Sequence, residues 1–298
     1  MTCFIHLFRP AAFLRVTGGD AGTFLQGQFT NELQQKAGCA TYGLWLNQKG
    51  KVVADSHVLR IGADEFMVAS MACSAGLIRQ RLEEYIVADD VTVADETARM
   101  HGILIWGATC GELLAARPAD GEIVREGESF VFAGRHTRGK NFLMIGPEAE
   151  ISQAKAAFVA GGAIQADAAS AEFFRISAGM PAVPGDIGPG DLPNEGGLES
   201  DAISYTKGCY LGQEVMARLK NLGRIRRRLH VVQGSGTSPA PLTALYQAGT
   251  KIGEIRSAAA QGNEFVAFAM LSLANLDPTA GLAPGPEQPP AWRIISHG

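Results

Sequence analysis

The sequence has few cysteines, and they form no pattern that builds a metal cage or a disulfide framework. Five occur in 298 residues, with no Cys-x-x-Cys pair: Cys3, Cys39, Cys73, Cys110 and Cys209. An odd, widely spaced set argues against a disulfide-stapled secreted domain and against a self-contained zinc or iron–sulfur site. We therefore predict a reducing, cytoplasmic location and no metal centre.

Several other signatures are missing as well. No uninterrupted apolar run reaches about 18 residues, the length that begins to indicate a transmembrane helix. Residues 1–7 have neither a basic n-region nor a long apolar core, which argues against a secretory signal. There is no phosphate loop, no Gly-x-Gly-x-x-Gly turn, no Gly-x-Ser-x-Gly elbow and no His-x-x-x-His pair. The common nucleotide-binding, hydrolase and helical zinc motifs are thereby excluded, and we expect no membrane partner.

What is present suits a globular, core-forming protein, with 46% hydrophobic and 19% charged residues. Strand-like and helix-like segments alternate through the first 160 residues. Asp20 follows two glycines and is the expected N-cap of the first helix, and residues 48–50 form the turn of a predicted hairpin. The expected strands are 13–17, 40–47, 51–60, 64–69, 100–106, 129–133 and 141–145. The further expected helices are 75–85, 110–116 and 151–160.

Two later regions differ in character. Residues 161–205 are rich in glycine and proline, and a long irregular stretch inside a compact domain is usually functional or disordered. After Arg228 the pattern becomes all-β, typical of a small barrel, and it ends in the proline-rich segment 277–298, in which we expect little order before Trp292. The short strands expected in this region are 229–232, 245–246, 251–257 and 265–271. We place a domain boundary near residue 225, which divides the chain into 1–224 and 225–298.

One cysteine has surroundings suited to chemistry. Cys209 lies in the octapeptide Lys-Gly-Cys-Tyr-Leu-Gly-Gln-Glu, residues 207–214. The flanking glycines permit a tight turn and the close approach of a ligand. The nearby lysine and the start of a helix after the octapeptide both favour a thiolate. The alternative is that Cys209 is a small, inert residue on a turn.

The octapeptide resembles the signature of YgfZ-type proteins, folate-binding relatives of the glycine-cleavage T-protein that include mitochondrial iron–sulfur assembly factors. Residues 18–27 also resemble the opening of that family, Gly-x-Asp-x-x-x-Phe-Leu-Gln-Gly, and the resemblance covers roughly residues 13–271. The T-protein branch lacks the cysteine, so Cys209 favours the YgfZ branch. The implied fold is α+β and T-protein-like: two α+β lobes with mainly antiparallel sheets and a small C-terminal β-barrel.

The resemblance also implies folate-binding residues. The blocks 175–181 and 192–195 match Arg-(Ile/Val)-x-x-Gly-x-Pro and Pro-x-Glu blocks that T-proteins and YgfZ-type proteins share. A carboxylate can accept both adjacent donors of a pterin, which makes Glu195 the expected pterin ligand. Arg175 would hold this loop or meet the glutamate tail of the folate. The further implied contacts are Lys207, Tyr210 and Arg227.

Asp55 is the candidate for one-carbon chemistry. It is expected at the end of the strand 50–55 and corresponds to the second aspartate of the T-protein block Gly-x-x-x-Asp-Asp, in which Ala54 replaces the first. In T-proteins this block supplies the catalytic aspartate. A carboxylate here can take up a proton or stabilise cationic character as a one-carbon unit moves. The alternative is an ordinary carboxylate at a solvent-exposed strand end.

A basic stretch breaks the otherwise acidic balance of the chain, whose formal net charge is −4. Six cations and no acid lie between Arg218 and Arg228. Such a stretch attracts anions, and three roles stay open: a solvated face, a site for the carboxylate tail of a folate, or an RNA contact. The acidic overall balance argues against direct nucleic-acid binding.

Two functions follow from these observations. The first is a tetrahydrofolate-binding accessory factor for iron–sulfur cluster assembly or repair, with assembly or client proteins as partners, supporting enzymes that include tRNA-modifying ones and using Cys209. The second is a tetrahydrofolate-dependent aminomethyl or other one-carbon transferase using Asp55. Both lead us to expect that Glu195 and Cys209 open onto one shared hollow.

Overall fold

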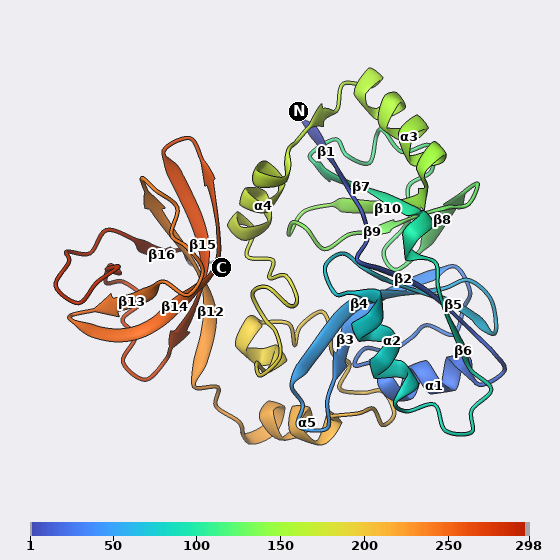
Figure 1. Cartoon of the computed structure of the whole chain (residues 1–298), viewed down its shortest axis with the longest axis horizontal. Coiled ribbons are helices and arrows are strands. Elements are labelled where there is room, and N and C mark those ends of the chain that lie inside the picture. The colour runs from blue at the N-terminus through green and yellow to red at the C-terminus, as the bar shows by residue number, and fades with distance from the viewer. Residues whose placement is uncertain (1, 296–298) are drawn as a thin grey trace.

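The computed structural model describes residues 2–295, in which the strands form three separate sheets (Figure 1). The α-helices of this part are α1 (Ala21–Gln28), α2 (Ala75–Glu83), α3 (Glu148–Ala160), α4 (Ala168–Ser177) and α5 (Gln213–Leu222). No helix within residues 2–295 has the length and apolar character needed to cross a membrane.

The first sheet has the order β3-β4-β5-β2-β6, and all of its neighbouring strands are antiparallel. Its strands are β2 (Ala12–Thr17), β3 (Cys39–Leu46), β4 (Val52–Arg60), β5 (Glu65–Ser70) and β6 (Thr92–Asp95). The predicted hairpin is the β3–β4 pair, in which Leu44 lies opposite Asp55. Asp20 takes the N-cap position of α1, but its carboxylate accepts a hydrogen bond from the backbone N–H of Asp90 at 2.8 Å instead of capping the helix.

The second sheet takes its central strands from two distant parts of the chain, with the order β11-β1-β7-β10-β9-β8. Its strands are β1 (Cys3–Phe8), β7 (Met100–Gly107), β8 (Ile123–Glu126), β9 (Ser129–Ala133), β10 (Asn141–Pro147) and β11 (Ile164–Gln165). The N-terminal strand β1 pairs antiparallel with β7 along its whole length, from Cys3 opposite Gly107 to Phe8 opposite Gly102. The chain therefore begins in the lobe that contains this second sheet, and only then forms the lobe that contains the first sheet.

The C-terminal strands form the expected small all-β unit, with the order β13-β14-β15-β12-β16. They are β12 (Arg227–Ser235), β13 (Ala244–Gln247), β14 (Thr250–Gln261), β15 (Glu264–Ser272) and β16 (Arg293–Ile295). The segment 282–283 joins the two edges, because Ala283 exchanges backbone hydrogen bonds with Tyr246 and Leu282 exchanges them with Trp292 beside β16. The ring of backbone hydrogen bonds is thereby closed. Strand β12 begins near the expected boundary, and the division into two domains stays a prediction.

Three local predictions were wrong. Residues 110–116 form turns instead of a helix, because Gly111 and the nearby Pro118 interrupt a segment too short to support one. Within the stretch expected to be irregular, α4 begins where Asp167 accepts a hydrogen bond from the N–H of Ser170 at 2.8 Å, an N-cap signal that was missed. Asp55 lies within β4 and not at its end.

Buried ion pairs hold the segment 178–200 between the lobes and the C-terminal sheet (Figure 1). Asp186 is fully buried and accepts a hydrogen bond from Arg175 of α4 at 2.7 Å, while Ser257 of β14 donates to its other oxygen. Asp191 accepts hydrogen bonds from Arg227 of β12 at 2.7 Å and Arg256 of β14 at 3.3 Å. These contacts add to the packing of Val183, Ile187 and Leu198, which are buried in a hydrophobic core.

We expect Asp186→Ala to lower the free energy of unfolding by about 1.5–3 kcal/mol, because it removes the fully buried acceptor of Arg175 and Ser257, while Glu172 remains a partner of Arg175. Urea titration followed by circular dichroism measures the change. The matched control is Glu83→Ala, which removes an exposed ion pair with Arg79 and should cost at most about 1 kcal/mol. Equal effects of the two substitutions would contradict the role given to the buried pair.

Candidate functional site

Asp55 lies on the wall of a cavity between the two lobes, where three donors surround its carboxylate. The Tyr42 hydroxyl on β3 donates to Oδ2 at 3.0 Å, and the Ser70 hydroxyl at the end of β5 donates to Oδ1 at 3.3 Å. The Cys73 sulfur lies 3.4 Å from Oδ1 and 3.2 Å from the carbonyl oxygen of Val183. Neighbouring strands place these side chains together, because residues on the same face of a sheet meet across the strands.

Burial governs the protonation of this group. It raises the pKa of Asp55 above its usual value, although the hydrogen bond from Tyr42 and the charge of Arg135 act in the opposite direction. Burial and the neighbouring Asp55 raise the pKa of Cys73 to about 12, so this sulfur is a thiol that donates a hydrogen bond. A carboxyl group with a raised pKa is suited to accept and return a proton near neutral pH.

The second lobe supplies the opposite wall. Arg135 follows β9, stacks its guanidinium 4.7 Å from the centre of the Tyr42 ring and pairs with Asp201 at 2.6 Å. Burial and Arg135 together lower the pKa of His57 to about 3, so its ring is neutral. Tyr42 and His57 pack with ring centres 5.2 Å apart, which gives the cavity an aromatic side.

The cavity has a volume of about 220 Å³ and combines this aromatic side with a few polar groups. Arg175 also reaches it, but its guanidinium already binds Asp186, Glu172 and the carbonyl oxygen of Met180. Whole ligands usually occupy pockets of about 300–1,000 Å³. A cavity of this size accepts one flat ring system with hydrogen-bond donors and acceptors, and leaves the rest of a longer ligand outside.

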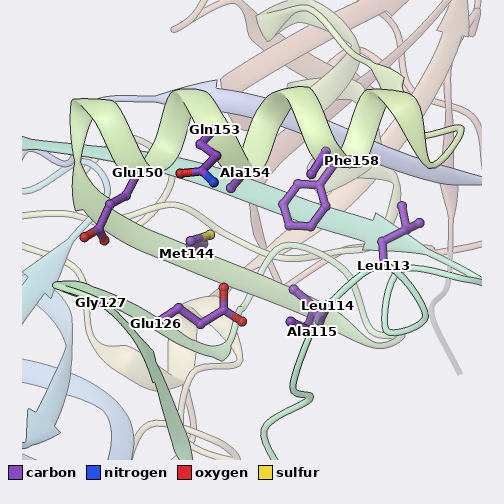
Figure 2. Close-up of a pocket in the computed structure, with 11 residues that line it drawn as sticks. Leu113, Leu114, Ala115, Glu126, Gly127, Met144, Glu150, Gln153, Ala154 and Phe158 are labelled. Carbon is purple, nitrogen blue, oxygen red and sulfur yellow. The ribbon is translucent and has the colours of Figure 1, made fainter.

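A larger cavity of about 400 Å³ lies under α3, away from Asp55 (Figure 2). Figure 2 shows Phe158 of the helix, Met144 of β10 and Leu114 around it, together with the carboxylates of Glu126 and Glu150. The Glu150 carboxylate already has partners inside the protein, because it accepts hydrogen bonds from the Ser129 hydroxyl at 2.5 Å and from a backbone N–H. No sequence-predicted site residue lines this cavity. We therefore choose the smaller Asp55 cavity as the candidate site because of the residues that line it, and not because of its volume.

Cys209 is exposed on a loop whose backbone is firmly held. Leu211 donates its N–H to the carbonyl oxygen of Gly27 at 3.2 Å, and α5 begins directly after the loop. Gly212 has φ +86°, and a Cβ atom there would lie 2.9 Å from the carbonyl oxygen of Asn47. Only glycine fits this position without strain, which explains the second glycine of the octapeptide.

Lys207 anchors the loop instead of facing the thiol. Its buried ammonium group donates to the carbonyl oxygens of Gln26, Phe29 and Asn31 at 2.7, 2.7 and 3.0 Å. These carbonyls take up all three donors of the ammonium group. Burial lowers the pKa of Lys207 to about 8. Tyr210 is buried against the ammonium group at 5.3 Å, and burial raises its pKa to about 12. The contacts of Lys207 are those of a structural anchor, whereas the buried hydroxyl of Tyr210 has no hydrogen-bond partner in the described part of the chain.

Glu195 is likewise engaged inside the protein. Arg227 donates to both of its oxygens at 2.9 and 3.2 Å, and the N–H of Leu192 donates to Oε2 at 2.8 Å. Burial alone would raise the pKa of Glu195, but these hydrogen bonds outweigh it, and the pKa lies below its usual value. The carboxylate therefore stays charged and paired.

The structure brings together only part of the predicted site. Asp55 and Arg175 line the cavity between the lobes, whereas neither Glu195 nor Cys209 lines it, and a hollow shared by these two residues stays a prediction. Sequence reasoning missed Tyr42 and Arg135, which contribute most to the chemistry around Asp55. Tyr42 could have been found from the sequence, because it lies on the strand paired with that of Asp55 in the predicted hairpin. Arg135 belongs to the other lobe, and no sequence pattern links it to Asp55.

The basic stretch is not one surface. Arg218 pairs with Glu214 within α5 at 2.9 Å, and Lys220 lies over the Tyr205 ring at 4.3 Å. Arg227 forms an ion pair with Glu195, so these cations of the stretch contact different parts of the protein.

Comparison with known proteins places the chain among named relatives. Residues 11–135 match the GCVT N-terminal domain. The chain is 29% identical over 286 residues to the iron–sulfur cluster assembly factor IBA57, mitochondrial, of Mus musculus, covering 87% of this chain and 75% of that protein. It is 30% identical over 273 residues to the Homo sapiens factor of the same name, covering 84% and 72%.

The chain is also 31% identical over 230 residues to the tRNA-modifying protein YgfZ of Edwardsiella ictaluri, covering 74% of this chain and 68% of that protein. The crystal structure of glycine cleavage system aminomethyltransferase T from Bartonella henselae superposes with a TM-score of 0.79 at 17% identity, covering 94% of this chain and 82% of that one. This superposition confirms the T-protein-like fold. The chain belongs to the family of YgfZ-type proteins and IBA57 iron–sulfur cluster assembly factors.

Proposed function

We propose that the protein is a folate-binding accessory factor for iron–sulfur cluster assembly or repair, and that it supports iron–sulfur enzymes, including tRNA-modifying ones. The names of its relatives support this proposal, since they are assembly factors and a tRNA-modifying protein. Its partners would be tetrahydrofolate or a derivative and the assembly or client proteins that receive its action.

The observation that carries the proposal is the presentation of Cys209. Its side chain is exposed, while Lys207 beside it is buried and bound to three carbonyl oxygens. An exposed thiol on a rigid loop reaches a macromolecular partner without rearrangement of the backbone, which reduces the entropic cost of the encounter. One thiol cannot hold a cluster alone, but it can serve as a transient ligand or as a nucleophile.

We assign the folate to the cavity beside Asp55. The aromatic side formed by Tyr42 and His57 suits a flat pterin, and Oδ2 of Asp55, which among the described residues accepts only from the Tyr42 hydroxyl, can accept one of its N–H donors. Glu195, Lys207 and Arg227 are already engaged with one another or with backbone atoms, and the Tyr210 ring packs on Lys207, so these residues support the neighbouring segments in this proposal. Arg175 contacts the cavity and holds α4.

A second candidate is a one-carbon transferase, which the surroundings of Asp55 favour. Burial raises the pKa of this carboxyl group, and Tyr42 and Ser70 orient it, as expected for a proton acceptor. Incubation with tetrahydrofolate and an aminomethyl donor separates the two candidates. Release of 5,10-methylenetetrahydrofolate supports the transferase, and folate binding without turnover supports the accessory factor.

We expect Asp55→Ala to weaken binding of tetrahydrofolate by about 10- to 100-fold, because a hydrogen bond to a charged group contributes about 1.5–3 kcal/mol. Anaerobic isothermal titration calorimetry measures the change. Asp64→Ala is the matched control, because this carboxylate is exposed on a loop outside the cavity. Unchanged affinity in Asp55→Ala, with normal circular dichroism, would remove the folate from this cavity.

We expect Cys209→Ser to retain the fold and folate binding but to lose function in cells. The exchange alters one exposed atom, and serine cannot supply a thiolate. The assay is rescue of iron–sulfur enzyme activity in a bacterium that lacks its own YgfZ. The control is Cys39→Ser, which replaces a partly buried cysteine on β3 and should rescue fully. Full rescue by Cys209→Ser would refute the proposed role of the thiol.

A further inference from the structure

A cavity of about 510 Å³ lies against the C-terminal sheet, outside the site described above. One wall is the face of β12 and β15, and the other is formed by Gly179, Gly197 and Ser200 of the glycine-rich segment. The Asp55 cavity has a different lining, although both adjoin the turn around Met180. No residue assigned to the thiol or the folate lines this second cavity.

The cavity is lined by two arginines and by no carboxylate. Arg138 donates one hydrogen bond, from its Nε–H to the carbonyl oxygen of Ala178 at 2.9 Å. Arg228 is exposed, and its guanidinium has no hydrogen-bond or ion-pair partner among the side chains that the structure describes. Its sequence neighbour Arg227 points the other way to Glu195, because successive side chains of a strand face opposite sides. Two guanidinium groups with unused donors give the cavity a positive field.

A third polar group lies on the same face of β12. His230 follows Arg228 by two residues on β12 and lines the same cavity. Its Nε2 atom is buried and has no hydrogen-bond partner in the described part of the chain. A buried polar atom without a partner costs free energy, and a bound ligand group would offset that cost. Burial and the charge of Arg228 lower the pKa of His230, so the ring is neutral and can donate from Nε2.

The remaining lining limits the class of ligand. Phe268, Val231 and Leu229 make an apolar side next to the arginines. Gly197 takes φ +70° and carries no side chain, and a Cβ atom there would lie 3.7 Å from Nη2 of Arg228. The volume lies in the usual range for small-molecule sites, about 300–1,000 Å³. The cavity thus has room for an apolar ring attached to an anionic group.

We propose that this cavity is a binding site for a small organic oxyanion, a phosphate ester or carboxylate carried on an apolar body. Arg228 and Arg138 bind the oxyanion, the Ser200 hydroxyl and His230 add hydrogen bonds, and Phe268 contacts the apolar body. Guanidinium groups match the planar geometry of both carboxylate and phosphate oxygens, so the shared chemistry is that of the oxyanion. The site is independent of the proposed folate and thiol functions.

The test is titration of the full chain with phenyl phosphate and with benzoate, followed by calorimetry and by the ring-proton NMR signals of His230. We expect saturable binding of at least one of the two anions, a shift of the His230 signals, and no binding of neutral benzyl alcohol. The tighter of the two anions shows whether the site prefers a phosphate ester or a carboxylate. Arg228→Gln should weaken binding by about tenfold or more, since it removes a charge-assisted contact.

The matched control is Arg224→Gln, an exposed cation of the same basic stretch that does not line the cavity. It should keep the affinity of the unchanged protein, and both variants should keep its circular dichroism. Absence of saturable binding of either anion at millimolar concentration would overturn the proposal. Equal losses in Arg224→Gln and Arg228→Gln would also overturn it, because they would indicate non-specific charge attraction.

Discussion

The buried ion pairs of the glycine- and proline-rich segment are the constraint on which the rest of the structure depends. Val183, Ile187 and Leu198 pack the segment into a hydrophobic core, and the ion pairs add fixed contacts to α4 and to the C-terminal sheet against the backbone entropy that favours its release. Asp186, without exposure to solvent, is compensated by Arg175 of α4 and by Ser257 of β14. A buried carboxylate needs such partners, and they belong to elements on either side, so the pairing fixes the segment between lobe and sheet.

This arrangement decides where the chemical groups of the protein can act. The positioned segment supplies Val183 to the Asp55 cavity and Gly197 to the cavity beside Arg228. The loop of Cys209 is fixed separately, by the three carbonyl oxygens that bind Lys207 near the end of α1. The Cys209 loop and the Asp55 strand are thus both held on the first lobe, but the thiol lies outside the cavity that the Asp55 carboxylate lines. An accessory factor with one surface for a partner and one cavity for a small molecule fits this separation.

Local patterns predicted much of the fold but not the pairing of distant segments. The hairpin of β3 and β4 and the strands around residues 129–147 follow from apolar alternation and short turns. The helix expected at 110–116 failed because its apolar residues were read without the breakers beside them. The pairing of β1 with β7 joins residues about a hundred positions apart, and no local signal marks such a partner.

The sequence by itself determined the family, the order of most strands and helices, and the candidates Asp55, Glu195 and Cys209, because motifs and periodicity are properties of neighbouring residues. Tertiary structure alone decided what those residues meet. Arg135 reaches the Asp55 cavity from the other lobe, and the Glu195 carboxylate forms an ion pair with Arg227. Charge pairing and burial depend on distances through space, and the linear order of residues does not contain those distances.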